Sequence, residues 1–385
     1  MIQRKISKKV LSYAKQYPVV TITGPRQSGK TTLSRMLFPH MKYFNLENIS
    51  EREFAKNDPR GFLKTCGNGA VLDEIQRVPE LLSYIQTLTD ERNKSGQFIL
   101  TGSQSFELMS SLSQSLAGRT AIVHLLPFSF DEIYKSSSKI AIEDVIYKGF
   151  YPRIHSKKLN PTEAYSFYVS TYVEKDLRSI LNVKDLSQFE AFLKLCAGRT
   201  GQILNLSSIA SDIGANHNTV KRWISILEAS YIVKLSQPFY KNINKRLIKA
   251  PKLYFIDTGL CAFLLGISSP SHITSHPLKG PLFETLVFSE ILKSRYNAGR
   301  TDSLYFYRDN NGNEVDVILE LGGEITCIEI KITETVSSGL FKGLKFFRKH
   351  YSEKNSLHLI YGGDEDYQRE NIFIHSWKNI PKISL

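Results

Sequence analysis

The chain has 385 residues, of which 42% are hydrophobic and 23% are charged. These fractions match average soluble globular proteins and exclude the disordered and fibrous classes. At roughly 100–200 residues per domain, the length predicts two or three domains. The apolar stretches fall short of the roughly 18 residues that a membrane-spanning helix needs. The basic residues 1–16 lack the apolar centre of a signal peptide, so we expect no contact with a membrane.

The cysteines indicate neither a metal site nor a disulfide framework. All four lie far apart in the sequence, and none belongs to a C-x-x-C pair. We therefore expect reduced thiols in the cores of a cytoplasmic protein. They are Cys66, Cys196, Cys261 and Cys327.

The positive charge is concentrated in one part of the chain. The net charge is +13 and the isoelectric point is about 9.3, which favours a polyanionic partner. Residues 199–258 contain nine lysines and arginines against three acids. Such a concentration is typical of a nucleic-acid-binding patch, so we expect DNA as a partner. General solubility is the alternative explanation of the charge.

A nucleotide-binding motif follows a short apolar segment. Residues 18–23 predict a buried strand, residues 24–31 read GPRQSGKT, and residues 32–38 predict a helix. A strand, a glycine-rich turn and a helix form the setting in which this motif binds phosphates. Lys30 is expected to reach the β- and γ-phosphates, and the Thr31 hydroxyl is expected to bind magnesium. The predicted ATP-binding residues are Gly24, Pro25, Arg26, Gln27, Ser28, Gly29, Lys30, Thr31 and Thr32.

Two acids end the apolar strand predicted at residues 69–72. Asp73 is expected to hold the magnesium ion together with Thr31, and Glu74 is expected to orient or deprotonate the attacking water. An ordinary solvated strand end is the alternative. The P-loop about forty residues earlier favours the catalytic interpretation.

Two further side chains are candidates for contact with the γ-phosphate. Ser103, with Thr101 as second choice, follows the strand predicted at residues 97–100, where additional-strand P-loop ATPases carry a polar sensor. A simple turn is the alternative there. Arg119 precedes a strand predicted at residues 120–123. It is expected to act as an arginine finger, in cis or from a neighbouring subunit, unless it is a surface arginine.

The basic region predicts a winged helix. Residues 206–228 contain a helix, a turn at Gly214 and a second helix. Strands at residues 231–235 and 253–256, around the basic loop 241–249, complete the pattern. A winged helix used only for packing between domains is the alternative. The predicted DNA contacts are Lys221, Arg222, Lys245, Arg246 and Lys249.

Acids and a lysine recur in the strands predicted near the end of the sequence. Asp316 lies in the strand at residues 314–319, and Glu329 and Lys331 lie in the strand at residues 325–331. Being two residues apart, Glu329 and Lys331 share one face of their strand. A metal-dependent nuclease needs acids that hold magnesium and a lysine that positions water. The alternative is a pairing of Lys331 with Glu329 or Asp316 that stabilises the sheet.

Together these motifs resemble a prokaryotic family of AAA-type ATPases with a winged helix and a C-terminal domain of unknown function similar to PD-(D/E)xK restriction endonucleases. The resemblance covers nearly the whole chain and implies an ATPase with a nuclease-like domain. It maps Glu284, Asp316, Glu329 and Lys331 onto the nuclease core, with Val315 where the motif's name has proline. It rests on residues 24–31, 43–47, 71–76, 100–103, 116–119, 283–284, 314–316 and 328–331.

We therefore predict an α/β protein with four regions. An AAA-type P-loop ATPase domain with a parallel sheet covers residues 1–134. A helical lid or linker region covers residues 135–198, with residues 135–139 as the best linker segment. A winged helix covers residues 199–265. An α/β restriction-endonuclease-like domain covers residues 266–385.

Two functions remain open from the sequence. The first is a cytoplasmic, magnesium-dependent ATPase that couples ATP hydrolysis to DNA handling or cleavage. The second is an ATP-dependent switch that controls a protein partner or a homo-oligomer, with a catalytically silent nuclease-like domain. ATP is favoured over GTP because no guanine-specifying N/T-K-x-D follows the P-loop. Salt-dependent affinity for DNA separates the two functions.

Overall fold

The computed structural model describes residues 2–103, 114–135, 139–173, 186–239, 249–321, 323–351 and 355–382. The chain forms two compact units. The first comprises residues 1–128, 229–231 and 296–300, and the second comprises residues 129–228, 232–295 and 301–385. Three segments that are far apart in the sequence thus build the first unit.

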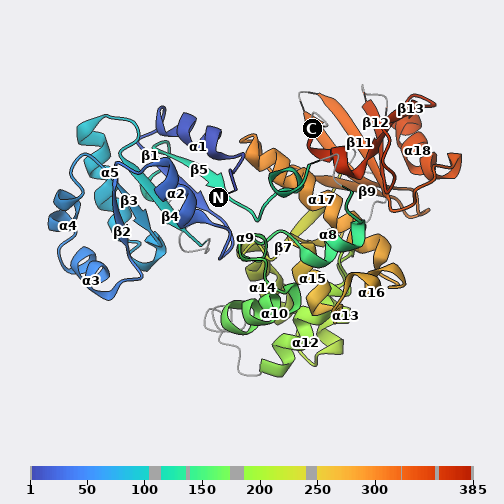
Figure 1. The fold of residues 1–385 in the computed structure, drawn as a ribbon, viewed down its shortest axis with the longest axis horizontal. Helices are drawn as coiled ribbons and strands as arrows, with labels where there is room; N and C mark the ends of the chain where they lie inside the picture. The colour runs from blue at the N-terminus through green and yellow to red at the C-terminus, as the bar shows by residue number, and fades with distance from the viewer. Residues whose placement is uncertain are drawn as a thin grey trace. The chain divides into compact units, whose positions relative to one another are not determined.

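The first unit is built on a parallel sheet whose described strands follow the order β2-β3-β4-β1-β5 (Figure 1). In the central strand β1, Val19 lies opposite Phe98 of β4 on one side and opposite Thr120 of β5 on the other. Strand β4 lies between β1 and β3, which is the additional strand assumed from the sequence. The predicted parallel α/β fold of the nucleotide domain is confirmed. The strands are β1 (Val19–Thr23), β2 (Lys42–Asn45), β3 (Ala70–Asp73), β4 (Phe98–Gly102) and β5 (Thr120–His124).

Helices cover both faces of this sheet. Side chains alternate along each strand, so Val71 packs with α1 and α2, whereas Ala70 and Leu72 pack with α3, α4 and α5. Asn48 and Asp58 begin α3 and α4 by accepting hydrogen bonds from backbone N–H groups of the first turn. The helices are α1 (Ser7–Ala14), α2 (Lys30–Leu37), α3 (Ile49–Asn57), α4 (Pro59–Thr65) and α5 (Leu81–Arg92).

Two tyrosines from late in the sequence complete the first unit. The phenol oxygen of Tyr231 lies 2.6 Å from His124 Nδ1 and 3.0 Å from the Thr23 hydroxyl. The ring of Tyr296 lies 4.7 Å from the His124 ring, centroid to centroid. Thr23 is the last residue of β1 and immediately precedes the P-loop. The two late segments therefore pack at the edge of the sheet where β1 and β5 end.

The second unit begins with a helical part. Asp257 organises it, because its carboxylate accepts hydrogen bonds from the backbone N–H groups of Leu260 and Phe150 and from the Tyr165 hydroxyl. Its described helices are α7 (Phe130–Ile133), α8 (Ile142–Lys148), α9 (Pro152–Lys157), α10 (Pro161–Tyr168), the π-helix η2 (Val169–Val173), α12 (Leu186–Ala197), α13 (Leu206–Asp212), α14 (His217–Ala229), α15 (Thr258–Leu264) and α16 (Pro270–Thr274).

A mixed sheet completes the second unit, with its described strands in the order β13-β14-β12-β11-β10-β9-β7-β8-β6. Strands β7 and β9 pair in parallel at Gln237 and Tyr305, so the sheet continues across residue 265, where the sequence predicts a domain boundary. The strands are β6 (Gln202–Ile203), β7 (Val233–Pro238), β8 (Lys252–Phe255), β9 (Tyr305–Arg308), β10 (Glu314–Leu321), β11 (Glu324–Lys331), β12 (Asn355–Tyr361), β13 (Tyr367–Arg369) and β14 (Ile372–Ser376).

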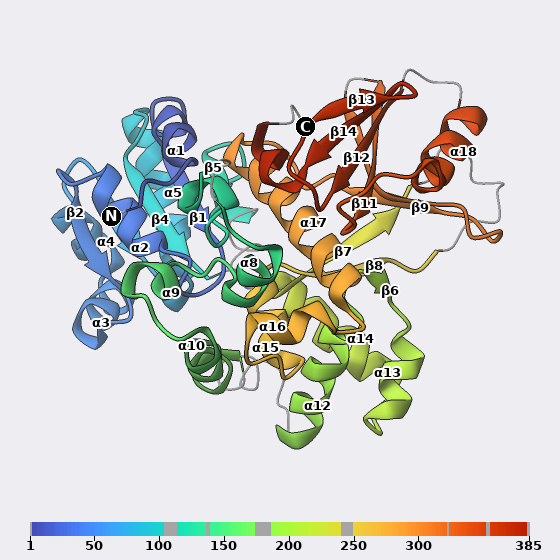
Figure 2. The same cartoon turned by 45° about the vertical axis from the view of Figure 1, so that its right-hand side comes forward.

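Helices pack against both parts of this sheet. Helix α18 (Lys342–His350), labelled in Figure 2, packs on β10 and β11. It buries Leu344 and Phe347. Helix α17 (Lys279–Asn297) packs on β8, where the rings of Phe288 and Tyr254 stack at 4.0 Å. The short 3-10 helices η3 (Ser338–Phe341) and η4 (Trp377–Lys382) complete the unit. Among the described residues, no helix has both the length and the apolar character needed to span a bilayer.

The four cysteines are free and buried, as expected for core thiols. Burial raises the pKa of the Cys66 thiol to about 12 and also raises the pKa values of the other three. A buried thiol with a raised pKa is a weak nucleophile. These cysteines therefore belong to the packing of the two units.

Candidate functional site

The P-loop requires glycine at two positions. Gly24, with φ of +155°, passes so close to β5 that a Cβ atom would lie 2.1 Å from the Leu125 carbonyl oxygen. Gly29, with φ of +95°, precedes the first residue of α2 in a left-handed conformation. The loop therefore turns tightly from β1 into the N-terminus of α2, where backbone N–H groups and the helix dipole favour an anion.

Lys30 is folded onto its own loop. Its ammonium donates to the carbonyl oxygens of Gly24 at 3.0 Å and Pro25 at 2.9 Å. Burial lowers the pKa of Lys30 to about 8, although Glu74 and Asp73 oppose this shift. The side chain is thus a buried cation at the phosphate-binding turn.

Asp73 joins the P-loop to two strands of the sheet. Its Oδ2 atom accepts hydrogen bonds from the Thr31 hydroxyl and the Tyr43 hydroxyl, each at 2.7 Å. Its Oδ1 atom accepts a hydrogen bond from the Thr101 hydroxyl of β4. Tyr43 was not among the predicted site residues, although it begins the segment 43–47 on which the resemblance rests. Burial and then Asp73 raise the pKa of Tyr43, so its hydroxyl remains a donor.

Glu74 and Ser103 are brought together by Gln76, which was not among the predicted site residues. The Gln76 side-chain amide donates to the Glu74 carboxylate and, at 2.9 Å, to the Ser103 hydroxyl. Glu74 itself has a left-handed backbone, with φ of +58°, directly after β3. Its backbone N–H donates to the Thr101 hydroxyl at 3.4 Å. The predicted general base and the predicted sensor therefore lie in one hydrogen-bonded group.

Arg4 holds the P-loop from outside the motif. One guanidinium nitrogen donates to the Ser28 carbonyl oxygen at 2.8 Å, and another donates to the Leu126 carbonyl oxygen at 2.7 Å. The residue is only 7% exposed. No local sequence signal distinguishes it from the other basic residues near the start of the chain. Within the motif, Arg26 lies 3.8 Å from the Glu47 carboxylate.

Arg119 lies at the N-terminal ends of the parallel strands, whereas the P-loop lies at their C-terminal ends. It precedes β5, which runs parallel to β1 with Thr120 opposite Val19. The P-loop follows the far end of β1, about 16 Å away at roughly 3.3 Å per strand residue. The Arg119 side chain pairs with Asp90 at 2.6 and 2.8 Å. The role in cis is therefore corrected, because a single arginine side chain does not bridge that separation.

The donor set at the P-loop fits a magnesium nucleotide. A backbone turn at a helix N-terminus, a buried ammonium, and a hydroxyl paired with a carboxylate are the groups that bind phosphates and Mg²⁺. Lys30, Thr31 and Asp73 supply them in the first unit. The described residues thus provide a complete set of side chains for this ligand.

The first half of α14 exposes polar and basic side chains. Lys221 and Arg222 are exposed, and a cavity of about 470 Å³ lies at the start of the helix. Its lining residues are Asn216, His217, Asn218, Thr219 and Arg222. Lys249 is also exposed. The predicted contacts Lys245 and Arg246 lie outside the described residues.

The acids of the C-terminal strands surround a lysine that was not among the predicted site residues. Lys252 of β8 is 2% exposed. Its ammonium lies 2.9 Å from Glu284 Oε1, 2.5 Å from Glu314 Oε1 and 3.5 Å from Asp316 Oδ1. The Tyr254 hydroxyl also donates to Glu284 Oε1, at 2.6 Å. Glu284, Glu314 and Asp316 are therefore brought together around one buried cation, which we call the Lys252 cluster.

Lys331 completes the Lys252 cluster from β11. Its ammonium lies 2.6 Å from Glu329 Oε1 and 3.3 Å from Asp316 Oδ2. Burial and then the nearby Asp316 raise the pKa of Glu329 to about 8, against the attraction of Lys331. Burial also raises the pKa of Glu284. For Asp316, burial acts in the same direction, but Lys331 and Lys252 outweigh it and hold its pKa below the usual range.

The Lys252 cluster does not fit the magnesium ion of a nuclease. Among the residues that the structure describes, no three carboxylate, imidazole or thiol groups are arranged so that they could hold a metal ion. The carboxylate oxygens face ammonium, hydroxyl and backbone N–H donors instead. The structure thus brings the predicted residues Glu284, Asp316, Glu329 and Lys331 into one cluster, but around a lysine.

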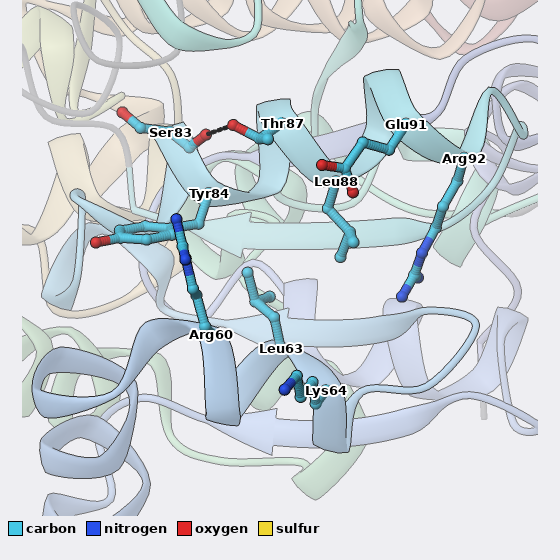
Figure 3. A pocket seen from close by; sticks show the side chains of 9 residues that line it. All are labelled: Arg60, Leu63, Lys64, Ser83, Tyr84, Thr87, Leu88, Glu91 and Arg92. Atoms are coloured by element: carbon cyan, nitrogen blue, oxygen red, sulfur yellow. Dashed lines mark hydrogen bonds between the residues drawn. The ribbon is translucent and has the colours of Figure 1, made fainter.

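A separate cavity of about 510 Å³ lies between α4 and α5 in the first unit (Figure 3). Leu63 and Leu88 form an apolar part, and the Arg60 side chain extends from α4 toward the Tyr84 ring on α5. None of the predicted site residues lines it. The sequence carries no local signal for this cavity, because its lining comes from two helices that are separated in the chain.

Three family models match the chain in succession. An AAA domain matches residues 16–134, and domains of unknown function match residues 139–271 (DUF8612) and 279–380 (DUF4143). The AAA match covers the P-loop and the strands β1 to β5 described above. The other two matches assign no activity to the second unit.

Known proteins and structures are similar to the chain over most of its length. The P-loop ATPase PABY2304 of Pyrococcus abyssi is 15% identical, covers 69% of this chain and 96% of its own, and has a TM-score of 0.47. DnaA of Aquifex aeolicus is 16% identical, with coverages of 58% and 85% and a TM-score of 0.29. The proteins Mb2031c of Mycobacterium bovis and Rv2008c of Mycobacterium tuberculosis, both described as uncharacterized, are each 30% identical over 326 residues, which is 83% of this chain and 71% of theirs. The chain belongs to the same family as these mycobacterial proteins, and its residues 16–134 form a P-loop ATPase domain of the AAA type.

Proposed function

We propose that the chain is a magnesium-dependent ATPase whose hydrolysis cycle controls its association with DNA. The observation that carries the ATPase part is the position of Asp73. One buried carboxylate accepts hydrogen bonds from Thr31 of the P-loop and Thr101 of β4, next to Glu74. Metal ligand, nucleotide loop and general base thus share one edge of the sheet, as phosphoryl transfer to water requires.

Each side chain of this edge has a distinct part in the proposed reaction. Lys30 exchanges the carbonyl oxygens of its own loop for phosphate oxygens of ATP. Thr31 and Asp73 would hold Mg²⁺, which neutralises charge on the β- and γ-phosphates when bound. Glu74 accepts the proton of the attacking water, and Gln76 holds both Glu74 and Ser103 in place.

The variant Glu74→Gln tests the ATPase proposal. It keeps the shape of the side chain and removes its ability to accept a proton, so we expect unchanged ATP binding and hydrolysis that is at least about 100-fold slower. The exposed Glu80→Gln is the matched control and should hydrolyse ATP at the wild-type rate. Wild-type turnover in Glu74→Gln would contradict the assigned base.

Arg119 is proposed to act on a nucleotide bound to a neighbouring subunit. Its place at the edge of the sheet opposite the P-loop, on the surface of the unit, supports this role. Pairing with Asp90 would hold the guanidinium until the neighbouring γ-phosphate approaches. The proposal requires that at least two copies of the chain assemble for full activity.

DNA association is proposed to occur through α14. The exposed first half of this helix carries Lys221 and Arg222 and no acid, and the helix start is lined by amide and hydroxyl side chains. Such groups contact phosphates and bases when a recognition helix enters the major groove. Lys249, Lys245 and Arg246 are proposed to add phosphate contacts. Helices α13 and α14 with strands β7 and β8 would then form a winged helix.

The alternative is an ATP-dependent switch that controls a protein partner or a homo-oligomer. The Lys252 cluster favours it over a DNA-cleaving enzyme, because a buried lysine lies among the acids of the nuclease-like site. The two proposals differ in their affinity for DNA at physiological salt, which is measurable for DNA handling and absent for the pure switch.

A further inference from the structure

The ATPase proposal gives no role to the buried ammonium of Lys252. We propose that Lys252 is the resident cation of the cluster formed by Glu284, Glu314 and Asp316, and that this cluster is an ionic joint of the fold in place of a metal-dependent cleavage centre. The proposal is independent of ATP hydrolysis. It concerns the second unit alone, to which all four residues belong.

The first argument is that the carboxylate oxygens already have donors. Asp316 Oδ1 faces Lys252 at 3.5 Å, and Asp316 Oδ2 accepts from the Ile330 backbone N–H at 2.9 Å and from Lys331 at 3.3 Å. Glu284 Oε1 accepts from both Lys252 and Tyr254. Magnesium binds through carboxylate oxygens at roughly 2.0–2.1 Å in near-octahedral geometry. It would therefore have to displace several of these donors at once.

The second argument is the fit of an ammonium group to these surroundings. An ammonium has three donors, and Lys252 directs its Nζ toward three separate carboxylates at 2.9, 2.5 and 3.5 Å. The Phe306 ring centroid lies 5.6 Å from the same nitrogen. A buried charge is stable only when its partners compensate for lost hydration, and removing one partner is strongly destabilising. The three carboxylates thus compensate for the hydration that the Lys252 ammonium loses on burial.

The third argument is charge balance. Around Asp316, the four carboxylates of Glu284, Glu314, Asp316 and Glu329 face the ammonium groups of Lys252 and Lys331 and the guanidinium of Arg308, which lies 3.2 Å from Glu314. A divalent ion needs deprotonated ligands with excess negative charge. Within the described residues, these three cations offset three of the four acids, so the excess is one negative charge, which is less than a divalent ion carries. Among the described carboxylates, only Glu329 has a buried oxygen, Oε2, without a hydrogen-bond partner.

The ionic joint also has a structural consequence. Lys252 lies in β8, Glu284 lies in α17, and Glu314 and Asp316 lie in β10. The cluster therefore ties the strand that precedes α15 to the C-terminal strands. Both sides of the joint lie in the second unit.

Mn²⁺ binding to the full-length, nucleotide-free chain tests the proposal. Electron paramagnetic resonance of free Mn²⁺ measures uptake directly, without any cleavage assay. We expect that the wild type and Asp316→Asn take up the same amount of Mn²⁺, because the metal does not enter the cluster. Uptake of one Mn²⁺ by the wild type that Asp316→Asn abolishes would overturn the proposal.

Lys252→Met tests whether the lysine stands in the place of a metal. Removal of the ammonium takes the cation from Glu284 and leaves Glu314 with Arg308 and Asp316 with Lys331. The cluster then has one positive charge fewer, so we expect Mn²⁺ affinity to rise by at least about tenfold and added Mn²⁺ to raise the Tm of this variant. Adding Asp316→Asn should abolish both effects. The matched control is Lys293→Met, which removes another buried lysine, paired with Glu290 at 2.8 Å in the same unit. A folded Lys252→Met chain with wild-type Mn²⁺ affinity would contradict the proposal.

A compensated variant covers the case in which Lys252→Met does not fold. In Lys252→Met/Glu314→Gln one negative charge leaves with the positive one, so we expect a higher Tm than for Lys252→Met and the same gain in Mn²⁺ affinity. Equal or lower stability of the double variant would show that Glu314 and Lys252 are not coupled and would also contradict the joint.

Discussion

Thr31 and Asp73 are separated by 42 residues, yet the Thr31 hydroxyl donates to Asp73 Oδ2 at 2.7 Å. Asp73→Asn keeps an acceptor for this bond but removes the negative charge that magnesium needs, so we expect ATP hydrolysis to fall by about 100-fold or more. The measurement is steady-state phosphate release at several magnesium concentrations. Tyr43→Phe is the control, because it removes a second donor to Asp73 and leaves the carboxylate charge intact. Equal loss in both variants would contradict the metal role.

Arg119 and Lys30 should complement each other between subunits. Arg119→Ala is expected to slow ATP hydrolysis by about 1,000-fold if its guanidinium acts on a neighbouring copy. Mixing this variant with Lys30→Ala should restore part of the activity, because some assemblies then pair an intact P-loop with an intact Arg119. Asp90→Ala, which removes the partner of Arg119, should retain hydrolysis. The absence of any recovery on mixing would contradict action in trans.

Charge reversal on α14 should weaken DNA binding in a salt-dependent way. For Lys221→Glu/Arg222→Glu we expect lower affinity and a salt slope smaller by about 0.9 for each phosphate that the variant no longer neutralises. Fluorescence anisotropy with labelled duplex DNA at several salt concentrations measures both. The control is Arg60→Glu/Lys64→Glu, which makes the same charge change on exposed residues of α4. Equal effects of the two pairs would indicate only a loss of net charge.

The C-terminal strands should lose stability in acid. His358 Nδ1 lies 3.0 Å from His375 Nε2, and burial together with His375 lowers the pKa of His358 to about 4. Below pH 6.5 the unfolded chain binds protons that the folded chain excludes. The free energy of unfolding should therefore fall as the pH drops from 6.5 to 4, by on the order of 2–3 kcal/mol from this residue.

Urea unfolding at several pH values, detected with a probe in the second unit, checks this prediction. His358→Phe should flatten the dependence, because its ring keeps the stacking with Phe373 but does not titrate. The exposed His272→Phe is the control and should keep the wild-type slope. An unchanged slope in His358→Phe would assign the acid sensitivity to other groups.

The parts of the site that lie close together in the sequence were predictable. The P-loop and the strand before it are recognisable within 14 residues, because glycine positions and hydrophobic periodicity are local signals. The edge at which Arg119 lies was also implied, since a residue that precedes a strand parallel to β1 lies at the end opposite the P-loop. The prediction left action in cis and action on a neighbouring subunit both open, because it did not use that geometric rule.

Other parts depend on long-range packing and leave no local signal. Lys252 meets Asp316 across 64 residues, and Arg4 meets Leu126 across 122. Lys252 begins the otherwise apolar strand Lys252–Phe255, which is a weak sign of a buried charge. Its partners depend on how β8, α17 and β10 come together. The predicted boundary at residue 265 likewise could not anticipate the pairing of β7 with β9.

The placement of Tyr231 and Tyr296 in the first unit affects any attempt to divide the chain. A fragment that ends at residue 134 would contain the AAA match, but it would lack the phenol that contacts His124 and Thr23 and the ring that packs on His124. A chimeric protein joined at residue 134 would likewise receive a first unit without residues 229–231 and 296–300. A first unit with all its contacts therefore needs residues 229–231 and 296–300, although the nucleotide motifs occupy only the first third of the sequence.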